Sequence, residues 1–104
     1  MIVVSDTSPI LNLNAIGYVW LFELLYGPLL IPPAVALELS RYGFDLAAAP
    51  WLQVRQPSDV ASIASLRLAL DPGEAEAIAL VKEVDADVIL LDERLGRRAA
   101  RAYW

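Results

Sequence analysis

Four acidic side chains of this chain are placed so that they could meet at one edge of a sheet. Two of them directly follow short apolar runs, residues 2–5 and residues 88–91, that are typical of buried strands. The other two come soon after proline-containing sequences that favour helix starts. If the strands are parallel, their carboxyl ends share one edge, and the helices that follow them begin there. The residues are Asp6, Glu38, Asp92 and either Glu74 or Glu76.

Such a group would bind a metal through oxygen alone, because the chain contains neither histidine nor cysteine. Oxygen ligands favour Mg²⁺ or Mn²⁺ over zinc. Clustered carboxylates repel one another until a cation neutralises them. A cation held in this way can activate water and stabilise the charge that develops on a phosphodiester, with no histidine base. The absent residue types also exclude thiolate sites, disulfides and serine–histidine catalysis.

Each acid also has a purely structural interpretation. Asp6 could be a turn residue, Asp92 an N-cap and Glu38 part of a solvated helix face. Asp71 and Glu74 have the spacing of a capping box, in which the glutamate bonds back to the start of its helix. Glu76 lies roughly 200° around the same helix from Glu74, so the two cannot both face one ion. The spacing of the residues does not decide between these structural roles and metal binding.

A basic stripe follows the last acid. The net charge is −5, but residues 1–93 hold four Lys or Arg and all thirteen Asp and Glu, which leaves −9 there and +4 beyond. The four arginines recur on one face of an expected helix, where they could contact a nucleic-acid backbone, receive an acidic partner or complement the helix dipole. They are Arg94, Arg97, Arg98 and Arg101.

The elements that must position these residues alternate between strand and helix, which predicts an α/β fold with a parallel sheet. Ser8 is the expected N-cap of the first helix, with Pro9 at its first position. The expected strands are 2–5, 29–31, 51–54 and 88–91. The expected helices are 9–16, 18–26, one from 32–33 onward, 57–70, 71–84 and 92–104.

Composition supports one globular domain over residues 1–104. Hydrophobic residues make up 58% of the chain and the mean hydropathy is +0.50, so disorder is not expected. No apolar run reaches the roughly 18 residues that a membrane span needs, and no signal peptide is recognisable. We therefore expect a cytoplasmic protein without a membrane partner.

Four ordered motifs resemble the PIN-domain family, in particular its bacterial and archaeal branch that begins with Asp-Thr-Ser-Pro. Each motif alone would be weak, but together they extend over almost the whole chain. In this sequence they stand as Val4-Ser5-Asp6-Thr7-Ser8-Pro9, Ile31-Pro32-Pro33-Ala34-Val35-Ala36-Leu37-Glu38-Leu39, Leu70-Asp71-Pro72-Gly73-Glu74-Ala75-Glu76-Ala77-Ile78 and Leu91-Asp92-Glu93-Arg94-Leu95-Gly96-Arg97.

The resemblance implies an RNase-H-like, three-layer α/β/α sandwich and a metal-dependent endoribonuclease. The resemblance maps the family's four metal-binding acids to Asp6, Glu38, Glu74 and Asp92, with Mg²⁺ or Mn²⁺ as the cofactor. Ser8 matches a supporting hydroxyl, and Glu76 and Glu93 are alternates. Many relatives are toxins of type II toxin–antitoxin modules that form homodimers and bind a small antitoxin.

One departure from the pattern affects the fold and the activity. Family members usually continue past the last motif with another short strand and helix, whereas this chain ends at Tyr103-Trp104. The resemblance thus implies a missing C-terminal element, and a sheet edge that dimerisation would have to cover. A catalytically silent module that only binds protein or RNA is the alternative. A phosphatase fits less well, because the second aspartate of its usual motif is absent after Asp6.

Overall fold

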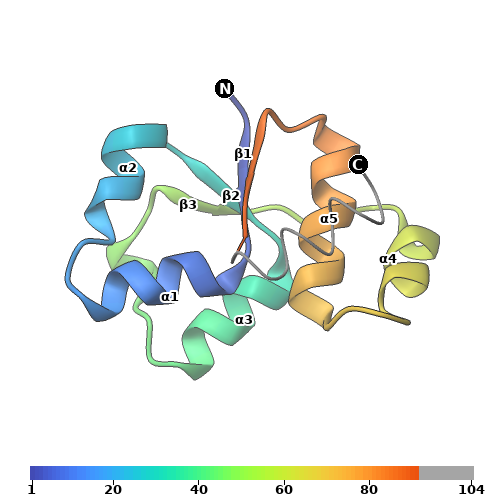
Figure 1. The fold of residues 1–104 in the computed structure, drawn as a ribbon, viewed down its shortest axis with the longest axis horizontal. Coiled ribbons are helices and arrows are strands. Elements are labelled where there is room, and N and C mark those ends of the chain that lie inside the picture. Colours follow the sequence, from blue (N-terminus) through green and yellow to red (C-terminus); the bar gives the residue numbers. More distant parts are fainter. Residues whose placement is uncertain (92–104) are drawn as a thin grey trace.

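The fold was obtained as a computed structural model, which describes residues 1–91 of the chain. Strands and helices alternate along almost all of it, as Figure 1 shows. The elements are β1 (Val3–Ser5), α1 (Thr7–Ala15), α2 (Trp20–Tyr26), β2 (Leu29–Ile31), α3 (Pro33–Arg41), the 3-10 helix η1 (Leu46–Ala48), β3 (Leu52–Val54), α4 (Val60–Leu66), α5 (Pro72–Val84) and β4 (Val88–Leu90).

The four strands form one sheet in the order β3-β2-β1-β4, and every pair is parallel. Val4 is in register with Leu30 of β2 and with Ile89 of β4. The parallel sheet predicted from the alternation of strands and helices is therefore confirmed. Its central strand, β1, leads directly into Asp6.

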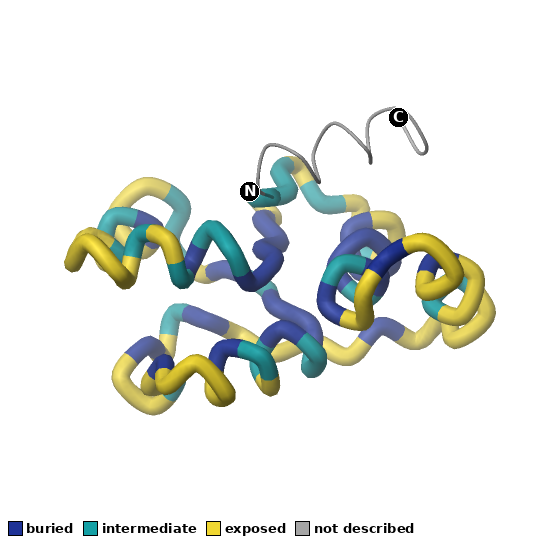
Figure 2. The backbone as a smooth tube through the Cα atoms, turned by 60° about the horizontal axis from the view of Figure 1, so that its bottom comes forward, coloured by how far each residue is buried: buried dark blue, intermediate teal, exposed yellow. Residues whose placement is uncertain are grey.

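The two faces of the sheet are covered by different helices. Val3 packs in a core cluster with residues of α1, α2 and α3, whereas the next residue, Val4, packs with residues of α5. This follows from the strand geometry, because successive side chains point to opposite faces. Figure 1 shows α1, α2 and α3 on one side of the strands and α5 on the other. Figure 2 shows the buried residues concentrated where these layers meet.

Helix α4 packs against α5 through a smaller cluster that contains Leu66, Leu70 and Ile78. The molecule is thus a three-layer α/β/α sandwich, as the resemblance implied. Within residues 1–91, no helix is both long enough and apolar enough to cross a bilayer.

Three helix starts differ from the sequence prediction, and one of them is that of α2, which begins at Trp20 and not at Tyr18. α1 begins at Thr7, not at Pro9, with Asp6 in extended backbone as its N-cap. Pro9 is still tolerated, because the first turn of a helix has no backbone partners for its N–H groups. α4 begins at Val60, not near Pro57, because the Asp59 side chain accepts a hydrogen bond from the Ser62 N–H and caps the helix there. α4 also ends earlier than predicted, at Leu66.

Candidate metal centre

Asp6 is held at the carboxyl edge of the sheet by backbone pairing. Its N–H donates to the carbonyl oxygen of Leu90 at 3.0 Å, which extends the β1–β4 pairing by one residue. The Ser5 hydroxyl donates to the Asp6 carbonyl oxygen at 2.8 Å. The residue is only 5% exposed. Asp6 is thus a buried acid whose backbone position is fixed by the pairing of β1 with β4.

Glu38 approaches Asp6 across the first turn of α5. A Cβ atom placed on Gly73 would lie 3.5 Å from Oδ1 of Asp6 and 3.6 Å from Oε2 of Glu38. Carboxylates from two elements therefore border the same small space, which the missing side chain of Gly73 leaves open. Two of the four predicted acids are brought together in this way.

Glu76 is bonded to the start of α3 through one of its carboxylate oxygens. Its Oε1 accepts a hydrogen bond of 3.1 Å from the Ala34 N–H in the first turn of α3. A carboxylate there satisfies a free N–H and interacts favourably with the positive end of the helix dipole. Ala34 and Glu38 lie on one face of α3, because they are four residues apart. Glu76 thus fixes α3 against α5 on the side that carries Glu38.

Glu74 is half-buried in the first turn of α5, next to Gly73. Its N–H donates to Oδ1 of Asp71 at 2.9 Å, so the Asp71 half of the predicted capping box is present. This bond uses the backbone N–H of Glu74 and not its carboxylate. Glu74 remains our preferred third ligand, because Glu76 is already bonded to α3.

Two hydroxyls follow Asp6. Ser8, the predicted supporting residue, is half-buried in the first turn of α1. Thr7 is only 2% exposed, and its Oγ1 has no hydrogen-bond partner among the described residues. A buried hydroxyl without a partner is costly, so it marks a place where water or a ligand is expected. Thr7 and Gly73 both lie inside the quoted motifs, but neither their residue type nor their spacing predicted a role at the site.

The other predicted site residues lie outside the described residues. The described chain ends at Leu91, one residue after the strand that pairs with β1. Asp92 and its neighbours therefore stay predictions. They are the fourth acid Asp92, the alternate Glu93 and the basic residues Arg94, Arg97, Arg98 and Arg101.

The described residues fit a divalent cation in part. The donors that border the space at Gly73 are oxygens, the set that Mg²⁺ and Mn²⁺ prefer. Mg²⁺ is commonly held by one or two carboxylates together with water and substrate phosphates. In residues 1–91 no three acidic side chains are close enough to hold an ion among themselves. Asp6 and Glu38 would thus form an open half-site that needs further ligands.

Comparison with known proteins agrees with the architecture. A family model described as a PIN domain matches residues 2–103, nearly the whole sequence. No curated protein and no solved structure matched the chain. The match includes all four motifs quoted above, and the all-parallel sheet with helices on both faces is consistent with it. This chain belongs to the PIN-domain family.

Proposed function

We propose that this protein is a metal-dependent endoribonuclease that hydrolyses RNA phosphodiesters. The observation that carries the proposal is the approach of Asp6 and Glu38 to one space at Gly73, at the carboxyl edge of the sheet. Ligands of open parallel α/β sheets bind at this edge. Because the chain belongs to a family of nucleases, we interpret the carboxylate pair as part of a metal site for phosphodiester hydrolysis.

The cation would be held by Asp6 and Glu38, with Glu74 and Asp92 as the further ligands. When bound, Mg²⁺ or Mn²⁺ would supply a Lewis acid that neutralises phosphate charge and lowers the pKa of water. The burial of Asp6 keeps competing water away from its carboxylate. Gly73 leaves room beside both oxygens, and Glu76 holds the helix that carries Glu38.

For the biological role, we propose the toxin of a type II toxin–antitoxin module. Its partners would be RNA as substrate, a small antitoxin protein and a second copy of the chain in a homodimer. The arginines at 94, 97, 98 and 101 would contact the RNA backbone. Support for this part comes from the family resemblance and from the basic stripe in the sequence.

The decisive experiment assays the full chain on a mixed pool of single-stranded RNA with Mn²⁺, with Mg²⁺ and with EDTA. We expect metal-dependent cleavage that falls by at least about 100-fold in Asp6→Asn, because one charged ligand is lost. Asp85→Asn is the matched control. Asp85 is exposed and has a φ of 52°, a left-handed conformation that asparagine tolerates well.

A second pair of variants separates the two candidate third ligands. Glu74→Gln should abolish cleavage and the metal response. Glu76→Gln keeps an oxygen that can accept the Ala34 N–H, and it should retain most activity. The reverse result would make Glu76 the ligand. No cleavage by folded protein, together with no rise in melting temperature on adding metal, would overturn the nuclease proposal and favour the catalytically silent binding module.

A further inference from the structure

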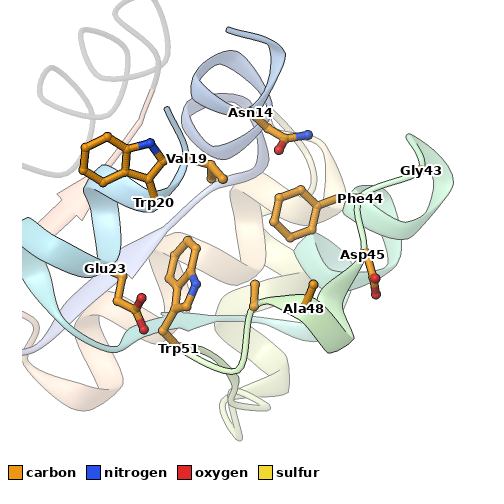
Figure 3. Close-up of a pocket in the computed structure, with 10 residues that line it drawn as sticks. Asn14, Val19, Trp20, Glu23, Gly43, Phe44, Asp45, Ala48 and Trp51 are labelled. Atoms are coloured by element: carbon orange, nitrogen blue, oxygen red, sulfur yellow. The ribbon is translucent and has the colours of Figure 1, made fainter. Parts of the chain in front are cut away.

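A pocket of about 450 Å³ lies away from the metal centre, between α2, the end of α1 and the segment that precedes β3 (Figure 3). Neither Asp6, Glu38 nor Glu74 lines it. Trp51, which does, comes directly before β3, and its carbonyl oxygen accepts the N–H of Leu29 at the start of β2. The pocket is thus near the amino ends of the strands, whereas Asp6 follows the carboxyl end of β1.

Aromatic side chains form much of the wall. Trp20 and Trp51 face the cavity with Phe44, and Figure 3 shows the three rings arranged around it. Trp20 is 52% exposed although it is a large apolar residue. Its ring centroid lies 6.2 Å from that of Tyr18, which is 50% exposed. Accessible tryptophan faces of this kind attract cations through the negative face of the ring.

The charged residues of the pocket would also attract a cation. Glu23 and Asp45 belong to its lining, and among residues 1–91 no lysine or arginine does. Figure 3 shows the Glu23 carboxylate beside Trp51. Asp45 already accepts the Ala47 N–H through Oδ1 and lies at the margin of the pocket. Glu23 is the acid that a cation stacked on the tryptophans would meet.

We propose that this pocket binds the side chain of an arginine presented by a segment of a partner protein. A guanidinium is planar, so it can stack on indole faces and pair with a carboxylate at the same time. A partner segment, not a free small molecule, is favoured by the exposed apolar side chains of the adjoining helix. Leu24 is 71% exposed and lies one turn of α2 after Trp20, so it can bury an apolar residue that neighbours the arginine.

RNA is a poorer occupant. Its bases could stack on tryptophan, but its phosphates would be repelled by Glu23 and Asp45. The proposal does not depend on nuclease activity, since it uses none of the acids of the metal centre.

The test titrates the full chain with the peptide acetyl-Leu-Arg-Leu-amide, followed by calorimetry and by the indole N–H signals in NMR spectra. The matched peptide carries citrulline, which has the same shape but no charge. We expect the arginine peptide to bind at least about 10-fold more tightly than the citrulline peptide, and to weaken as salt is added. Signals of Trp20 and Trp51 should shift.

Variants then locate the site. Glu23→Gln and Trp20→Leu should each weaken the arginine peptide by about 5-fold, since each removes one partner of the cation. Both residues are exposed, so the fold should survive, and Asp85→Asn serves as the control. Asp6→Asn should bind the peptide as the parent protein does, which separates this result from any failure of the nuclease proposal.

Other outcomes would overturn the proposal. Equal binding of free arginine and of the peptide would indicate a small-molecule site. Single-stranded RNA that competes for the pocket would indicate base stacking. A dimer that Trp20→Leu dissociates in the absence of peptide would show that a second copy of the chain covers this surface.

Discussion

Gly73 has no side chain, and this leaves open the space that the carboxylates of Asp6 and Glu38 both border. It is buried in the first turn of α5, and the position of its missing Cβ lies within 3.6 Å of oxygens from both Asp6 and Glu38. These distances are ordinary van der Waals contacts, so alanine would fit. It would, however, place a methyl group where a cation or its water is expected.

Gly73→Ala should therefore weaken metal binding without lowering the stability of the metal-free protein. Alanine is the better helix former, so the metal-free protein should be as stable as the parent or more stable, by up to about 1 kcal/mol. The rise in melting temperature that Mn²⁺ causes should shrink, and the metal affinity should fall about 10-fold. Thermal unfolding with and without Mn²⁺ measures both effects. An unchanged metal response would show that the space at Gly73 is not part of a metal site.

At the scale of the element, local hydrogen bonds decide where helices begin. Asp59 caps α4 by accepting the Ser62 N–H at 3.0 Å, and Asp71 caps α5 by accepting the Glu74 N–H. The carboxylate of Glu83 on α5 accepts the N–H and the hydroxyl of Ser58, which fastens the segment before α4 to α5. These hydrogen bonds help to hold α4 on α5, because Leu66 is the one residue of α4 that is buried.

The cap at Asp59 predicts a pH dependence. The backbone hydrogen bond from Ser62, with a side-chain bond from the same residue, lowers the pKa of Asp59 below its ordinary 3.8. Stability from the charged cap is therefore fully present above pH 3.8, and it is lost as the pH falls through the lower folded-state pKa. Asp59→Asn keeps an acceptor that does not titrate.

Urea unfolding of Asp59→Asn and of the parent protein, at neutral pH and at successively lower pH, checks this prediction. The parent should be the more stable of the two near neutral pH, and the difference should shrink in acid. A difference that stays constant through the acid range would show that the charge of Asp59 does not contribute. Asp85→Asn again provides a control, because Asp85 is an exposed aspartate that caps no helix start.

At the scale of the whole molecule, a narrow core holds the sheet between its two helical layers. Leu80 of α5 is fully buried and packs in one cluster with Val4 of β1, while Ile89 of β4 lies against the same cluster. The strands are only three residues long. Because few side chains of each strand can pack in the core, the loss of one buried side chain should lower the stability of the whole sheet.

Leu80→Ala should destabilise the protein by about 2–5 kcal/mol, because it removes buried methyl groups and leaves a cavity. That is a large part of the roughly 5–15 kcal/mol that stabilises a typical domain. Leu68→Ala is the matched control, since Leu68 is 89% exposed and its loss should change stability by less than about 0.5 kcal/mol. Denaturant unfolding compares the two. Equal effects would show that α5 does not anchor the sheet.

Within residues 1–91, the sequence by itself determined the order of the strands and α-helices, the parallel sheet and the position of Asp6 at its carboxyl edge. These features depend on short-range causes: strand-forming runs, prolines at helix starts and capping side chains. Three helix starts were misplaced. Asp6 occupies the N-cap position of α1 without a side-chain cap bond, the Asp59 side chain caps α4, and α2 begins two residues later than expected. The family motifs also name the four acids, of which the described structure brings Asp6 and Glu38 together.

Only the tertiary structure decided which side chains meet across the layers. The bond from Ala34 to Glu76 joins residues 42 positions apart, so no local pattern could assign Glu76 to the start of α3. The space at Gly73 and the pocket between Trp20 and Trp51 likewise exist only where separate elements pack together. Periodicity tells which face of a helix is buried, but the packing of whole layers determines what that face touches.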